Sequence, residues 1–114
     1  MKLKMMILIV SSVLVLAMSC TKETAVCNTE KVTYNNQIKT IMAGCTYPGC
    51  HNSGSVNGGL TSYQECINFP KKDKLLSAVN WDGKAVIMPP SKNKISDCDI
   101  SKMAKWIDSG YPEN

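Results

Sequence analysis

The sequence predicts an all-α fold. Two stretches, residues 34–43 and 100–109, space their apolar side chains at the three- and four-residue intervals of a helix with one buried face. The apolar positions are Tyr34, Ile38, Ile41 and Met42 in the first stretch, and Ile100, Met103, Ala104 and Ile107 in the second. No stretch of useful length alternates apolar and polar residues as a half-buried strand does. We therefore expect helices joined by loops.

The first predicted helix covers residues 34–43, and Gly44 is expected to end it. Residues 52–59 are rich in glycine, serine and asparagine and predict a flexible loop. A second short helix should open at Ser62, because Ser62-x-x-Glu65 has the form of a capping box. Phe69-Pro70 should close it.

A third short helix is predicted over residues 75–79, followed by a turn at residues 80–83. The lysine-rich residues 71–74 before it are interpreted as a solvated face. The last helix should open at Ser96-x-x-Asp99, and Gly110 and Pro112 should stop it.

The N-terminus has the features of an export signal. A basic start precedes an almost wholly apolar run, which is shorter than a membrane-spanning helix and ends in small residues. Ala17-Met18-Ser19-Cys20 has the form of a lipobox, so we expect residues 1–19 to be removed and Cys20 to carry lipid. Residues 20–31 would then be a tether and residues 32–114 the folded domain. Ordinary cleavage nearby and an uncleaved anchor are the alternatives, and each also places the domain outside the cytoplasm.

The charge of the chain argues against nucleic-acid binding. The chain has 13 basic and 9 acidic residues, and two of the lysines lie in the predicted signal, so the remainder is close to neutral. No basic stripe is present of the kind that binds nucleic acid. All the basic residues are lysines, which suits loose electrostatic docking better than bidentate recognition of an anion.

The segment Cys45-Thr46-Tyr47-Pro48-Gly49-Cys50-His51 carries the clearest chemical signal. Two thiols followed directly by the only histidine of the chain resemble a covalent haem attachment site, with four residues rather than two between the cysteines. Cys45 and Cys50 would bond the two vinyl groups of one porphyrin, and His51 would be the proximal ligand of its iron. Pro48-Gly49 is expected to turn the chain so that the two sulfurs come into reach. A small Cys45–Cys50 disulfide loop and a zinc site remain alternatives.

The second axial ligand is predicted to be Met88. A single histidine excludes bis-histidine ligation within a monomer, and a methionine thioether is a neutral ligand that raises the reduction potential. Pro89 and Pro90 lack backbone donors and have restricted φ, which suits a stiff loop that presents the sulfur. The alternative is that Met88 fills space in the core, as most methionines do.

Three cysteines remain once Cys20, Cys45 and Cys50 are assigned to lipid and haem. An odd number predicts one disulfide and one thiol in a monomer. We favour the pair Cys27–Cys98, because both residues lie just before helices that should pack together, and we expect Cys66 to be a buried thiol. Other connectivities remain open at this point.

Taken in order, these motifs resemble small c-type cytochrome domains with the class I fold, including lipoprotein versions. The matching pieces are Val32-x-Tyr34 with Ile38, Cys45-x4-Cys50-His51-Asn52, Gly58-Gly59-Leu60, Met88-Pro89-Pro90, Ile95-Ser96-Asp97 and Trp106-Ile107-Asp108-Ser109-Gly110. The resemblance implies four to five short helices packed around one covalently bound haem c, with the first and last helices crossing beside it. It also implies the roles already given to Cys45, Cys50, His51 and Met88.

The function expected from this resemblance is electron transfer by a monohaem cytochrome, without substrate turnover of its own. Redox proteins would bind at the exposed haem edge, and Cys20 would anchor a monomer to a membrane at the periplasmic or cell-surface side of the cell envelope. Two alternatives remain. One is a five-coordinate haem enzyme or small-ligand sensor in which Met88 is not a ligand, and the other is a haem-free lipoprotein stabilised by disulfides.

Overall fold

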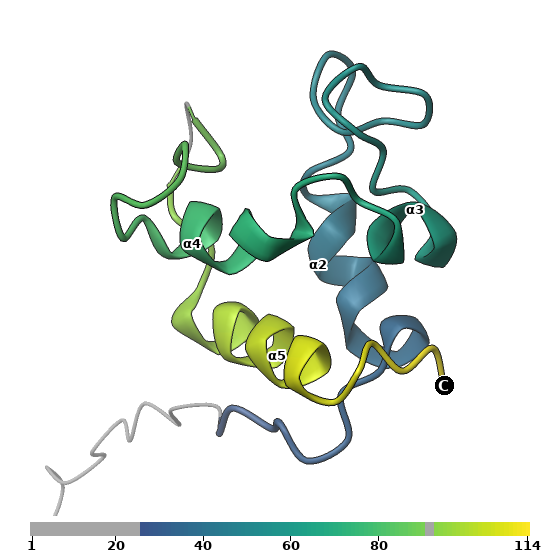
Figure 1. Ribbon diagram of the computed structural model, residues 1–114. Helices are drawn as coiled ribbons and strands as arrows, with labels where there is room; N and C mark the ends of the chain where they lie inside the picture. Colours follow the sequence, from purple (N-terminus) through teal and green to yellow (C-terminus); the bar gives the residue numbers. More distant parts are fainter. Residues whose placement is uncertain (1–25, 91–92) are drawn as a thin grey trace, which may run out of the picture.

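The computed structural model describes residues 26–90 and 93–114, and within them it contains helices and no strand (Figure 1). The predicted all-α class is therefore confirmed for the described residues. The elements are η1 (Tyr34–Ile38), α2 (Lys39–Ala43), α3 (Tyr63–Ile67), η2 (Lys72–Lys74), α4 (Leu75–Asn80) and α5 (Asp97–Asp108). The predicted signal, the lipidation site Cys20 and residues 21–25 of the predicted tether lie outside the described residues.

The first predicted helix is formed by η1 and α2 in direct succession. Its first five residues are a π-helix, and the rest is α-helical up to Ala43, where Gly44 follows as predicted. The Thr33 hydroxyl caps the start by accepting a hydrogen bond from the Asn36 N–H at 3.2 Å. The side chains on the predicted apolar face pack inward, and Ile38 and Met42 are almost completely buried.

The middle of the chain forms α3, η2 and α4. The Ser62 hydroxyl accepts the Glu65 N–H at 3.2 Å, so the predicted cap at the start of α3 is confirmed. The 3₁₀ turn η2 leads directly into α4, whose C-terminal cap is Trp81. Trp81 has left-handed backbone angles, φ 61° and ψ 38°.

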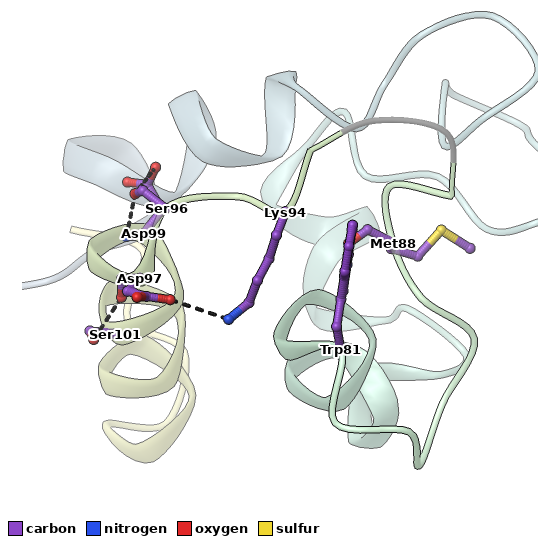
Figure 2. A network of polar contacts seen from close by, with 7 residues as sticks. All are labelled: Trp81, Met88, Lys94, Ser96, Asp97, Asp99 and Ser101. Atoms are coloured by element: carbon purple, nitrogen blue, oxygen red, sulfur yellow. Dashed lines mark hydrogen bonds and ion pairs between the residues drawn. The ribbon is translucent and has the colours of Figure 1, made fainter.

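Helix α5 begins where the sequence predicts it. The Ser96 hydroxyl accepts the Asp99 N–H at 3.0 Å and donates to the Asp99 carboxylate at 2.8 Å (Figure 2). Lys94 adds an ion pair with Asp97 at 3.2 Å in the first turn, where a negative side chain also favours the helix dipole. The buried face of α5 consists of Ile100, Met103 and Trp106.

The C-terminal segment joins the first helix to the last. The Pro112 carbonyl accepts hydrogen bonds from the Tyr34 N–H and from the Trp106 indole N–H, both at 2.9 Å. The Tyr63 hydroxyl donates to the Tyr111 carbonyl at 2.9 Å. The rings of Tyr34, Tyr63, Trp106 and Tyr111 pack with centroid separations between 5.0 and 6.3 Å. We call these four residues the aromatic end, and through them η1 contacts α5 as the sequence predicts.

A disulfide joins Cys27 to Cys98, with its Cα atoms 5.5 Å apart, so the favoured pairing is confirmed. Cys98 is the second residue of α5 rather than the residue before it. The bond connects the part of the chain predicted as the end of the tether to the start of α5. Cys66 is a buried thiol, also as predicted. No helix within the described residues is long and apolar enough to cross a membrane.

Candidate functional site

The two cysteines of the motif lie on either side of a tight turn. The Cys50 N–H donates to the Tyr47 carbonyl at 2.9 Å, and Gly49 has a φ of 81°. Proline followed by a residue with positive φ is the pattern of a type II turn, so the turn predicted at Pro48-Gly49 is confirmed. Cys45 follows Gly44, the C-terminal cap of α2, and packs against the core, whereas Cys50 is exposed. The Cys45 side chain is thus packed against the helices, whereas Cys50 lies exposed at the end of the turn.

His51 is held through its backbone and through its ring. Its N–H donates to the Cys45 carbonyl at 3.1 Å, and its carbonyl accepts the N–H of the buried Leu60 at 2.9 Å. The ring nitrogen Nδ1 lies 2.9 Å from the Gly58 carbonyl. Because a carbonyl oxygen can only accept, Nδ1 carries the proton in this hydrogen bond. The Nε2 lone pair of His51 is then available for a metal, and a backbone carbonyl is a usual partner for the other nitrogen of a metal-binding histidine.

Gly58 is required for this arrangement on steric grounds. Its φ is 88°, and a Cβ at this position would lie 2.6 Å from a ring carbon of Phe69. The Phe69 ring in turn meets the His51 ring edge to face, with centroids 5.5 Å apart. A side chain at residue 58 would therefore displace either the carbonyl that orients His51 or the ring that packs against it.

Glu65 holds the loop between His51 and α3. Its carboxylate accepts hydrogen bonds from the Thr61 hydroxyl at 2.6 Å, the Thr61 N–H at 2.7 Å and the Ser53 hydroxyl at 2.9 Å. These bonds, led by that of the Thr61 hydroxyl, lower the pKa of the Glu65 carboxyl. Because Ser53 and Thr61 lie near opposite ends of the loop, the carboxylate of the half-buried Glu65 fastens both ends to α3.

Met88 lies on a second loop, which follows α4. Its side chain is half-buried, and its N–H donates to the Ala78 carbonyl in α4 at 3.0 Å. Figure 1 shows this loop and the one carrying His51 extending beyond the helices on the side away from α5. The structure therefore places Cys45, Cys50 and His51 together in one loop and Met88 in another.

Both loops expose apolar side chains. Val56 and Tyr47 are exposed in the first loop, and Val86 and Ile87 in the second, with Val56 completely exposed and Val86 73% exposed. Besides these apolar side chains, the two loops carry two thiols, one oriented imidazole and one thioether, which are the kinds of group that hold a c-type haem.

Two observations concern the zinc and disulfide alternatives for Cys45 and Cys50. Within residues 26–90 and 93–114, no group of three or more His, Cys, Asp or Glu side chains is placed to hold a metal ion, whereas a structural zinc site needs four ligands. Cys45 and Cys50 are not bridged to each other, although the same structure bridges Cys27 to Cys98.

Cys66 lies beside this site, but its thiol has low reactivity. Its thiol points to the Leu60 carbonyl at 3.6 Å. Burial, with smaller contributions from the nearby Glu65 and Cys45, raises the pKa of the Cys66 thiol to about 12. A thiol with this pKa is a poor nucleophile at neutral pH, which agrees with its interpretation as a core residue.

Sequence reasoning missed the residues that orient the candidate ligands. Ser62-x-x-Glu65 had marked Glu65 as a helix cap, but its carboxylate binds Thr61 and Ser53. Gly58 belonged to a recognised Gly-Gly-Leu piece, but no local signal shows that its carbonyl accepts from His51. Neither the family models nor the curated proteins nor the solved structures with which the chain was compared gave a match.

Proposed function

We propose that this chain is a monohaem c-type cytochrome that transfers electrons at the cell envelope. The observation that carries the proposal is the orientation of His51. Directly after the second of the two motif cysteines, the only histidine of the chain donates from Nδ1 to the Gly58 carbonyl and so keeps Nε2 available. This is the arrangement that a proximal ligand requires.

Each residue has a distinct role in this proposal. Cys45 and Cys50 would hold the porphyrin through thioether bonds, and His51 and Met88 would bind its iron. When bound, the haem would supply one-electron redox chemistry, accepting an electron from a reduced partner protein and passing it to an oxidised one. The neutral thioether of Met88 would favour the reduced form and thereby raise the potential. With His51 and Met88 both bound to the iron, the haem would have no open coordination site for a substrate.

The location forms part of the proposal. The Cys27–Cys98 disulfide is typical of an oxidising compartment such as the periplasm or the cell surface. Cys20 would carry the lipid that anchors the domain to a membrane. Labelling with a radioactive fatty acid tests this point, because Cys20→Ser should abolish incorporation if the lipobox is used.

The decisive experiment is haem staining of a denaturing gel after expression of the full chain with a c-type maturation system. Only thioether-linked haem survives denaturation, so the wild type should stain and a Cys45→Ser/Cys50→Ser double variant should not. Colourless wild-type protein would reject the proposal in favour of the haem-free disulfide-stabilised lipoprotein.

A second measurement separates the cytochrome from the five-coordinate haem protein. The oxidised wild type should show a near-infrared sulfur-to-iron band, and Met88→Ala should remove it, lower the reduction potential and let the reduced protein bind carbon monoxide. Ready binding of carbon monoxide by the wild type would instead support the enzyme or sensor.

A further inference from the structure

Met88 is attached to the end of α4 at two points. Its N–H donates to the Ala78 carbonyl at 3.0 Å, and its carbonyl accepts the Trp81 indole N–H at 2.8 Å. Figure 2 shows the Trp81 ring beside the Met88 backbone while the Met88 sulfur points away from the ring. Both backbone polar groups of Met88 are therefore satisfied by α4 and its cap, and the side chain is left to reach outward.

The presence of tryptophan at position 81 needs an explanation. The residue has a φ of 61°, a left-handed conformation that is unfavourable for a bulky side chain and natural for glycine. Its side chain is 37% exposed, so core packing is not the main reason for its presence. The specific contact that it makes with the loop is the indole hydrogen bond to Met88.

The turn that carries Trp81 is fastened by its neighbours. The Trp81 N–H donates to the Ser77 carbonyl at 3.1 Å, and the Ser77 hydroxyl donates to the Asp82 carboxylate. The same carboxylate accepts the Lys84 N–H at 2.9 Å. Strained backbone persists where surrounding interactions over-determine it, and such positions are concentrated at functional sites. The indole is thus held by a turn that has little freedom to move.

From these contacts we infer that Trp81 is the positioning residue for Met88, an inference that rests on the proposed function. The indole N–H fixes the Met88 carbonyl, which sets the direction in which the side chain leaves the backbone. A thioether is a weak neutral ligand for iron. The stability of its bond would therefore depend on the conformational entropy that the Met88 loop loses on binding. By restricting the loop in advance, Trp81 keeps the sulfur bound and the potential high.

The test compares Trp81→Phe with the wild type in the haem-loaded full chain. Phenylalanine keeps an aromatic ring and removes the N–H, and a net hydrogen bond corresponds to about a fivefold change in an equilibrium constant. We expect Met88 to dissociate about fivefold more readily, so that the imidazole concentration that removes half of the sulfur-to-iron band in the oxidised protein falls about fivefold. The reduction potential should fall, and the reduced variant should bind carbon monoxide more readily.

Trp106→Phe is the matched control. Trp106 also donates its indole N–H to a carbonyl, that of Pro112, but it lies fully buried at the aromatic end. Its replacement should lower the stability of the domain and leave the imidazole concentration that removes half of the band unchanged below the unfolding temperature. Equal shifts in both variants would mean that Trp81 acts only through general stability, which overturns the inference.

Two further measurements separate the inference from the function on which it rests. If Met88→Ala removes the band while Trp81→Phe leaves the band, the potential and carbon monoxide binding at wild-type values, the cytochrome assignment stands and the role of Trp81 is rejected. If Met88→Ala leaves the spectrum unchanged, the ligand assignment itself fails. Should Trp81→Phe not fold, hydrogen exchange of the indole N–H in the wild type decides, because a Trp81 indole that exchanges as fast as free indole has no bond to Met88.

Discussion

The two ends of this domain are built by different interactions. At the aromatic end, Trp106 is completely buried and the rings around it are joined by hydrogen bonds to the C-terminal segment. At the other end, two loops expose apolar side chains. They are held by hydrogen bonds to the Gly58 carbonyl and the Glu65 carboxylate and from the Trp81 indole. The first end has a packed core from the polypeptide alone. The second has the oriented side chain of a candidate ligand, His51, and exposed apolar side chains, and under the proposed function a haem would complete it.

The largest expected effect lies at the aromatic end. Trp106→Ala removes the largest fully buried side chain and the indole hydrogen bond to Pro112, and should lower the free energy of unfolding by about 3–5 kcal/mol. Denaturant unfolding of the haem-free protein measures the change. A loss below about 1 kcal/mol would show that the aromatic end is not the main source of stability and would remove the contrast between the two ends.

Removal of the Cys27–Cys98 disulfide is expected to have the next largest effect on stability. A Cys27→Ser/Cys98→Ser variant should lose about 2–5 kcal/mol of stability, because a covalent link across 71 residues restricts the unfolded chain. Urea unfolding with and without reductant gives the measurement. Reductant should destabilise the wild type and leave the double variant unaffected. If both respond alike to reductant, the bond is not the origin of the difference.

Variants of Gly58 test whether the loop that carries His51 depends on the close packing of Gly58 against Phe69. Gly58→Ala combines positive-φ strain with a clash against Phe69 and should cost about 2–4 kcal/mol, with a reduced yield of haem-loaded protein. Gly54→Ala is the matched control, because Gly54 has a similar φ of 71° but open space where the Cβ would lie, and it should cost about 1 kcal/mol. Equal losses in the two variants would contradict a close packing of Gly58 on Phe69.

The smallest effect concerns Glu65 and depends on pH. Hydrogen bonds from Thr61 and Ser53 lower the pKa of its carboxyl in the folded state, so its contribution to stability is present above the unfolded pKa and is lost as the pH falls through the folded value. Wild type should therefore be more stable than Glu65→Gln at neutral pH, and the difference should vanish in acid. Urea unfolding at several pH values checks this, with the exposed Glu30→Gln as the control. A difference that is independent of pH would contradict an ionised acceptor.

Local patterns predicted much of the chain correctly. The apolar spacing located the first and last helices, Ser62 and Ser96 cap the helices that they were expected to open, and Pro48-Gly49 turns the chain between the cysteines. These predictions succeeded because caps, turns and amphipathic faces are decided by residues only a few positions apart. The Cys27–Cys98 pairing could also be favoured, because it followed from which helices pack together.

The sequence alone therefore determined the helices, the turn between the thiols and the identities of the candidate ligands. Only the tertiary structure decided how those ligands are oriented. The His51 ring depends on the Gly58 carbonyl, the loop around it on the Glu65 carboxylate, and the Met88 backbone on the Trp81 indole. The physical reason is that each of these hydrogen bonds joins atoms whose approach depends on how helices and loops pack, and that packing leaves no local pattern in the sequence.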